Sequence, residues 1–159
     1  MATESEPWKP PDEYIMPPAP WPCPEKRTVR DLLGPSFPPI VCLCGSTRFV
    51  AFFAAANLRE TLAGRIVLSI GSTTTSDEEL GLSRDVKQRL DELHLRKIDL
   101  ADEMFVLNVG GYIGESTGNE LAYALAMKKP VRTLEYLDLE AWLAERMRHM
   151  NATAMRNLE

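Results

Sequence analysis

The stretch that decides the fold is VLNVGGYIGESTGNELAYALAMKKPV, residues 106–131. It begins as an apolar run, passes through four glycines and continues as an amphipathic pattern that a Lys-Lys-Pro sequence ends. This order is typical of a buried strand, a loop and a helix. Glu120 is expected in the first turn of that helix. A carboxylate near the carboxyl end of a strand, behind the loop Gly-Glu-Ser-Thr-Gly, needs a structural or a chemical reason.

The pattern on either side of this stretch repeats the same alternation. Continuous apolar runs predict strands at 40–44, 65–71, 103–110 and 130–135. Helical spacing or capping signals predict helices at 48–64, 84–102, 116–129 and 138–150. Strands of this kind, alternating with helices, are typical of a parallel sheet that is covered on both faces. We therefore predict an α/β fold with a doubly wound, mostly parallel sheet of four to five strands, flavodoxin-like or Rossmann-like.

Proline divides the chain into two parts. Eleven of the twelve prolines lie in residues 1–39. Proline excludes the interior of a helix and the centre of a sheet, so we predict a proline-rich N-terminal extension over 1–39 and one α/β domain over 40–159. The extension also contains several aromatic and aliphatic residues. A disordered leader and a tail that lies across the domain or a partner subunit are both compatible with this composition.

Charge and hydropathy exclude some classes of partner. The net charge of -5 over 159 residues gives no reason to expect nucleic acid as a partner. No apolar run approaches the roughly 20 residues that span a bilayer, so no membrane partner is expected. The acidic, proline-rich N-terminus does not have the pattern of a secretory signal. We expect a cytoplasmic protein.

Two cysteines lie in the first predicted strand. Cys42 and Cys44 are two residues apart, so they point to the same face. Their spacing is not that of a Cys-x-x-Cys motif, and no other cysteine or histidine is arranged in the sequence to complement them. We interpret them as small core residues and expect no metal site.

Ligands of parallel sheets bind beyond the carboxyl ends of the strands, where the strand order reverses. After the first strand, the turn Gly45–Arg48 offers backbone N–H groups that can bind a phosphate, although a plain tight turn explains it equally well. The patterns G-x-x-x-x-G-K-[ST] and G-x-G-x-x-G are absent, so no nucleoside triphosphate or dinucleotide cofactor is expected. The polar loop 71–83 is interpreted as a lid that selects the base of the ligand, although a merely mobile loop explains the pattern nearly as well.

Three further side chains can each be interpreted in two ways. Ser116 and Thr117 are candidate N-caps, with Thr117 and Glu120 forming a capping box, or else they bind an anion or sugar hydroxyls together with the exposed N–H groups beside them. His94 lies four residues after Leu90 and four before Ile98, beside the apolar stripe of its helix. It is either a packed core residue or a group that transfers protons near neutral pH.

Three motifs in this order resemble the nucleoside 2-deoxyribosyltransferase superfamily, which includes the 2′-deoxynucleoside 5′-monophosphate N-hydrolases. They are VCLCGSTR, LHLRKIDLADEMFVLN and STGNELAYALAMKKPV, and the resemblance covers about residues 40–135. It implies that Glu120 matches the catalytic Glu of the family, Thr117 a loop hydroxyl and Ser46 a residue that touches substrate. His94 lies at or near a position where the family has an Asp. Gly114 replaces an Asp of the transferases, which favours hydrolysis over transfer.

The resemblance implies a small-molecule nucleoside or nucleoside 5′-monophosphate as substrate, no cofactor, and a homo-oligomer of two or more subunits. Cleavage of an N-glycosidic bond develops positive charge on the anomeric carbon, which a carboxylate can stabilise or attack. A second group protonates the departing base. We predict Glu120 and His94 as catalytic residues, with Glu120 kept ionised by the helix dipole. The predicted substrate-binding residues are Gly45, Ser46, Thr47, Arg48, Asn108, Gly111, Tyr112, Ser116 and Thr117. The alternative is a nucleotide-binding module without turnover.

Overall fold

The computed structural model describes residues 29–71 and 83–156. The strands are β1 (Ile40–Cys44), β2 (Ile66–Leu68), β3 (Glu103–Val106) and β4 (Val131–Thr133). The helices are α1 (Val29–Leu33), α2 (Val50–Leu62), α3 (Arg84–Leu100), α4 (Glu115–Ala126) and α5 (Leu139–Arg156). Two 3-10 turns, η1 (Thr47–Phe49) and η2 (Val109–Gly111), follow β1 and β3.

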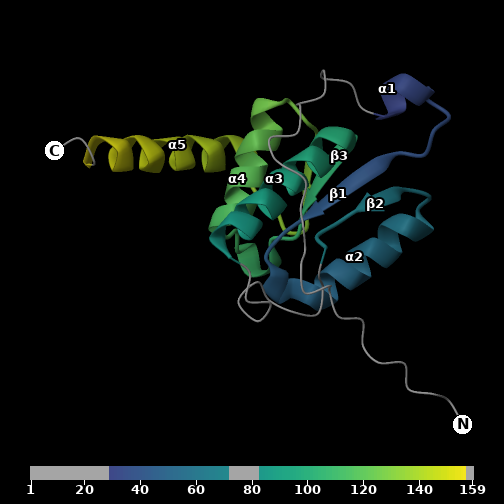
Figure 1. Cartoon of the computed structure of the whole chain (residues 1–159), viewed down its shortest axis with the longest axis horizontal. Coiled ribbons are helices and arrows are strands. Elements are labelled where there is room, and N and C mark those ends of the chain that lie inside the picture. The colour runs from purple at the N-terminus through teal and green to yellow at the C-terminus, as the bar shows by residue number, and fades with distance from the viewer. Residues whose placement is uncertain (1–28, 72–82, 157–159) are drawn as a thin grey trace, which may run out of the picture.

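The four strands form one parallel sheet in the order β2-β1-β3-β4. Helix α2 covers one face of the sheet, and α3 and α4 cover the other (Figure 1). This arrangement confirms the doubly wound α/β fold that the alternation of strands and helices predicts. The chain leaves β1 toward β2 on one side and later returns to place β3 on the other side. The strand order therefore reverses between β1 and β3.

The core has two layers because successive side chains of β1 point to opposite faces. Val41 and Leu43 pack with Phe53 of α2, and Cys42 and Cys44 pack under α3 and α4. All five residues of β1 are buried, which explains why the sequence of this strand is continuously apolar rather than alternating.

Several predicted boundaries shift. The predicted strands at 65–71 and 103–110 end earlier, at Leu68 and Val106. The last helix continues to Arg156 and projects from the body of the domain (Figure 1). Within the predicted extension, Val29 and Phe37 pack against the core beside α3 and α4. The predicted lid loop falls almost entirely on residues 72–82, outside the described part of the chain.

An ionic cluster completes the face of the sheet that carries α2. The Glu60 carboxylate, whose side chain is 4% exposed, contacts Arg59 at 3.0 Å, Arg65 at 3.4 Å and Arg132 at 3.0 Å. Glu103 contacts Arg65 at 2.7 Å and Arg132 at 2.8 Å. These arginines offset the desolvation of the buried carboxylate, since an unpaired charge in this position would be strongly destabilising.

Glu60→Gln is expected to lower the free energy of unfolding at pH 7 by about 1–3 kcal/mol, because hydrogen bonds to a charged group are lost. Burial raises the pKa of Glu60, but hydrogen bonds from Arg132 and Arg59 and their charges outweigh it, so the pKa falls below its ordinary value of 4.5. The stabilisation is therefore present above that value and is lost as the pH falls through the lower pKa of the folded state. Urea unfolding at several pH values measures the difference.

The matched control is Glu145→Gln, which removes an exposed ion pair with Arg148 on α5. Exposed pairs contribute about 0–1 kcal/mol, so this variant should unfold almost like the wild type. If Glu60→Gln were equally destabilising at pH 7 and pH 3, the charge of Glu60 would not be the source of its effect.

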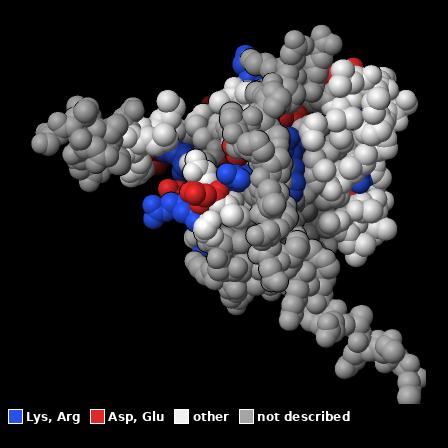
Figure 2. Space-filling model, in the orientation of Figure 1, with Lys and Arg blue, Asp and Glu red and all other residues white. Residues whose placement is uncertain are grey.

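The described surface mixes both signs of charge. Figure 2 shows Lys and Arg beside Asp and Glu near α5, and few charged side chains where α2 lies. Within residues 29–71 and 83–156, no helix has both the length and the apolar character needed to cross a bilayer.

Candidate functional site

The candidate site lies at the carboxyl edge of the sheet, between β1 and β3. The loops that follow these two strands meet there. Arg48 donates from Nη2 to the Tyr112 hydroxyl at 3.3 Å, and its guanidinium carbon lies 4.3 Å from the centroid of the Tyr112 ring. The Phe49 ring packs edge-on against Tyr112, with the centroids 6.0 Å apart. The structure thus brings two predicted binding residues, Arg48 and Tyr112, together from loops far apart in sequence.

Gly45 permits the close approach of these two loops. A Cβ atom at this position would lie 3.1 Å from Leu107 Cβ, 3.2 Å from the Leu107 carbonyl oxygen and 3.4 Å from the Phe53 ring. The carbonyl oxygen belongs to the chain as it leaves β3, where the Leu107 N–H donates to the Cys44 carbonyl at 2.8 Å. The need for glycine here is therefore steric.

Gly45→Ala is expected to lower the free energy of unfolding by about 1–3 kcal/mol, the usual cost of overpacking a rigid site. The matched control is Gly71→Ala, because a Cβ atom at Gly71 meets no atom of the described residues within 4 Å. Thermal unfolding of both variants, followed by circular dichroism, measures the difference. Equal melting temperatures for the two variants would contradict the steric explanation.

Glu120 lies deeper in α4 than the sequence indicates. The helix begins at Glu115 with Gly114 as its N-cap, and the Gly118 N–H donates to the Gly114 carbonyl at 2.8 Å. Glu120 is therefore the sixth residue of α4, so its predicted place in the first turn is wrong. The capping box with Thr117 is wrong for the same reason, since Ser116 and Thr117 also lie inside the helix.

The surroundings of Glu120 raise its pKa to about 7. Burial is the main cause, since this residue is only 8% exposed. The charge on His94 acts in the opposite direction. The helix dipole acts mainly within the first turn, so it does not keep this carboxylate ionised in the way the sequence analysis predicts.

His94 faces Glu120 from α3. Its Nε2 atom lies 4.0 Å from Glu120 Oε1, and both side chains are buried. Burial lowers the pKa of His94, but a hydrogen bond with Cys42 and the charges of Cys42 and Glu120 raise it, so the net shift is upward. The structure therefore brings the two predicted catalytic residues together and buries His94 in the core.

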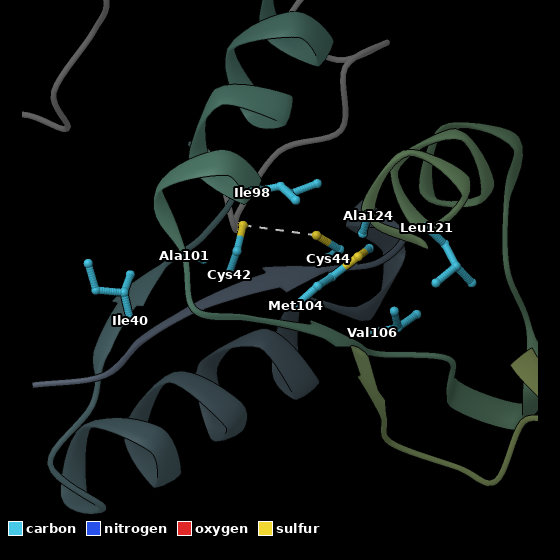
Figure 3. Packing of buried hydrophobic residues seen from close by; sticks show 9 residues of the cluster. All are labelled: Ile40, Cys42, Cys44, Ile98, Ala101, Met104, Val106, Leu121 and Ala124. Atoms are coloured by element: carbon cyan, nitrogen blue, oxygen red, sulfur yellow. Dashed lines mark hydrogen bonds between the residues drawn. The ribbon is translucent and has the colours of Figure 1, made fainter. Parts of the chain in front are cut away.

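The two cysteines of β1 complete this group. Figure 3 shows Cys42 and Cys44 on the same side of the strand, among apolar side chains, with their sulfur atoms 4.0 Å apart. His94 Nε2 lies 3.2 Å from Cys44 Sγ and 3.8 Å from Cys42 Sγ. Both cysteines are buried as predicted, but the expectation that no histidine complements them is wrong.

The two thiols differ in acidity. The hydrogen bond with Cys44 lowers the pKa of Cys42, and although burial acts in the opposite direction, contacts with His94 bring it to about 6. Burial raises the pKa of Cys44, as does the hydrogen bond with Cys42. The sulfur, imidazole and carboxyl groups thus form one electrostatically coupled group.

Asp91 is a further acid beside the site. It is exposed on α3, one turn before His94, and it accepts a hydrogen bond from the Ser116 hydroxyl at 3.4 Å. Its charge contributes to the raised pKa of Glu120. Asp91 is not among the site residues predicted from the sequence, although its i, i+3 spacing to His94 places both on neighbouring parts of one helical face.

The other predicted binding residues separate into two groups. Asn108 is 1% exposed, and its side chain donates to the Glu135 carbonyl at 3.1 Å and accepts from the Glu135 N–H at 2.9 Å. The Asn108 amide therefore joins the ends of β3 and β4, which gives this residue a structural role, and its substrate contact stays a prediction. Thr117 is also buried. The predicted residues that remain at least partly exposed at this edge are Gly45, Ser46, Thr47, Arg48, Gly111, Tyr112 and Ser116.

Gly111 requires its glycine for conformational reasons. Its φ angle is 74°, in the left-handed region that favours glycine, and a Cβ atom there would meet no atom within 4 Å. Gly110 is also left-handed, and its N–H donates to Glu135 Oε1 at 2.7 Å. The loop after β3 is thus held in place by Glu135, and the Gly111 N–H donates to the Asn108 carbonyl at 2.9 Å.

No protein-family model matches the chain, and no curated protein matches it. What the site can do is therefore argued from its own geometry. In this geometry, a buried carboxylate lies next to an imidazole. Partly exposed hydroxyl, guanidinium and aromatic groups lie on the loops at the same edge of the sheet.

Proposed function

We propose that this protein cleaves the N-glycosidic bond of a nucleoside or nucleoside 5′-monophosphate and releases the free base. The observation that carries the proposal is the 4.0 Å approach of His94 Nε2 to Glu120 Oε1 at the carboxyl edge of the sheet. A carboxylate nucleophile and a proton donor at short range are what a covalent glycosyl-enzyme route needs, with about 5 Å between the groups in retaining glycosidases. The sequence resemblance to the nucleoside 2-deoxyribosyltransferase superfamily supports the same reaction.

In the proposed mechanism, a Glu120 oxygen attacks the anomeric carbon as the bond from that carbon to the base nitrogen breaks. The base leaves with the bonding electron pair and takes a proton from His94. Water then attacks the anomeric carbon of the glycosyl-enzyme, which releases the sugar and restores the Glu120 carboxylate. The proton that this water loses reprotonates His94, so both groups return to their starting state.

The partly exposed loops supply the substrate contacts in this proposal. The Arg48 guanidinium lies over one face of the Tyr112 ring, and this stacked pair can present a flat surface to a base. The hydroxyls of Ser46, Thr47 and Ser116 can hydrogen-bond the sugar. Asp91 is the second candidate for the proton donor, because it is exposed beside the site whereas His94 Nε2 also faces two sulfur atoms.

The crowding of His94 also favours a second candidate function, a nucleotide-binding module without turnover. An imidazole nitrogen that faces Cys42 and Cys44 is less open to a departing base than one that faces solvent. In this alternative, the same loops bind the nucleotide, and Glu120 does not attack it.

A base-release screen separates the two functions. Common nucleosides and their 5′-monophosphates are incubated with the protein, and free base is measured by chromatography while calorimetry measures binding. Release of base from at least one compound supports the N-glycosidase. Tight binding without any released base supports the binding module. Adding a second free base as acceptor distinguishes transfer from hydrolysis. Light scattering tests the dimer or larger oligomer that the resemblance implies.

A further inference from the structure

Cys42, Cys44 and His94 present three metal-binding atoms toward one point. The edges of the triangle are 4.0 Å between the two sulfur atoms, 3.8 Å from Cys42 Sγ to Nε2 and 3.2 Å from Cys44 Sγ to Nε2. All three residues are buried. Among the described residues, they form the group of potential metal ligands whose donor atoms all lie within 4.8 Å of one another. Cys42 and Cys44 are neighbours on one face of β1, and His94 lies on α3. These two elements hold the three side chains in place.

The size of this triangle matches a zinc site. Tetrahedral Zn²⁺ with bonds of about 2.3 Å to sulfur and about 2.0 Å to nitrogen separates two sulfurs by about 3.8 Å, and sulfur from nitrogen by about 3.6 Å. The observed sulfur–sulfur edge is 4.0 Å, and the two sulfur–nitrogen edges lie on either side of the ideal. The equidistant point in the plane of the three atoms lies about 2.1 Å from each of them, so an ion slightly above this plane can reach all three at bond lengths suited to coordination.

A fourth donor lies next to the triangle. Glu120 Oε1 is 4.0 Å from His94 Nε2, and it approaches from α4, opposite the strand that carries the cysteines. Two thiolates, one imidazole and one carboxylate form a donor set that suits Zn²⁺ and does not suit Mg²⁺ or Ca²⁺, which prefer oxygen ligands.

We propose that Cys42, Cys44 and His94 bind one Zn²⁺ ion, with the Glu120 carboxylate as the fourth ligand. The surrounding side chains favour such a site, because the buried apolar side chains of Ile98, Met104 and Ala124 lie around the sulfur atoms (Figure 3). A dry apolar shell strengthens the attraction between a cation and its anionic ligands.

The zinc site has a consequence for the proposed reaction, and this consequence alone rests on the proposed function. A bound ion takes the imidazole nitrogen and the carboxylate oxygen that would otherwise act on the substrate. The metal-bound protein is therefore the inactive form, and the metal-free protein is the form that releases base. Metal binding itself does not depend on which reaction the protein performs.

The test uses the full chain, reduced and freed of metal with a chelator, then titrated with Co²⁺ as a spectroscopic probe and with Zn²⁺ in competition. One Co²⁺ per chain is expected, with intense near-ultraviolet absorption from thiolate ligands and visible bands typical of tetrahedral Co²⁺. Cys42→Ala, Cys44→Ala and His94→Gln should each weaken Zn²⁺ binding by more than about 100-fold, since even an outer partner of a ligand contributes about 10- to 100-fold. Glu120→Gln should weaken binding less and change the visible bands.

The control replaces a residue of the same type as one of the ligands at a position outside the site. His149→Gln should bind Co²⁺ like the wild type, because His149 is exposed on α5 and does not belong to the cluster. X-ray absorption of the zinc-loaded wild type needs no variant, so it remains decisive if a cysteine variant fails to fold. Two sulfur neighbours at about 2.3 Å support the site. A shell of only nitrogen and oxygen, or no stoichiometric binding, overturns it. Failure of the proposed reaction would appear in base release and not in these spectra.

Discussion

Glu120→Gln is expected to lower the rate of base release by about 1,000-fold or more, as removal of a nucleophile does in other enzymes. Glutamine has nearly the same shape as glutamate but cannot form the glycosyl-enzyme ester. The group that is lost faces His94 at 4.0 Å in the buried part of the site. Single-turnover base release, followed by chromatography on the best substrate of the screen, measures the effect.

Stability and binding show whether this loss is chemical. Substrate affinity should survive, and the free energy of unfolding should change by no more than about 1 kcal/mol, since no helix cap is removed. The matched control is Glu115→Gln at the first residue of the same helix, where the side chain is exposed. That variant should keep its activity. Base release near the wild-type rate from Glu120→Gln would overturn the proposed mechanism.

Phe105→Ala is expected to lower the free energy of unfolding by about 3–5 kcal/mol, the usual cost of removing a large buried ring. Phe105 is 1% exposed at the centre of β3 and packs in the core layer under α2. The Arg132 guanidinium also lies 4.0 Å from the centroid of its ring. The substitution therefore leaves a cavity and removes the surface on which an arginine of the ionic cluster rests.

Urea unfolding followed by circular dichroism measures this change. The matched control is Leu58→Ala on the exposed side of α2, where 62% of the residue is accessible. Surface substitutions of this kind usually change stability by less than about 0.5 kcal/mol. A loss below about 1 kcal/mol for Phe105→Ala would mean that the core relaxes around the missing ring.

The order of strands and helices could be predicted because each strand is a continuous apolar run between turn residues. The strand Ile40–Cys44 is the clearest example, and its predicted bounds agree with the structure. Boundaries were less predictable where a glycine precedes a helix. At Gly114, the extended backbone serves as N-cap without a side-chain hydrogen bond, so the hydroxyls that follow gave a misleading signal.

The contacts between the loops of the site could be predicted from the sequence, but the contacts of its buried residues could not. Arg48 and Tyr112 follow neighbouring strands, so strand order alone brings them together. The contact between His94 and the cysteines depends on α3 crossing over β1, which the right-handed crossover from β2 to β3 makes plausible but does not fix residue by residue. The role of Asn108 depends on a backbone partner, Glu135, that lies 27 positions away in the sequence. A local pattern cannot reveal such a partner.

The central position of β1 in the sheet also governs how the chain assembles. Both partners of β1 come later in the sequence, and the Ile40 N–H bonds to the Asp102 side chain across 62 residues. All strand pairs are parallel, so no hairpin forms early to template the sheet. The unit of β1, α2 and β2 can form first, but one edge of β1 stays unpaired until β3 arrives. Pairing of β3 with β1 closes a long loop of the chain, so this step should limit the folding rate. Until it occurs, the unpaired edge of β1 is the part of a newly made chain most exposed to pairing with another chain.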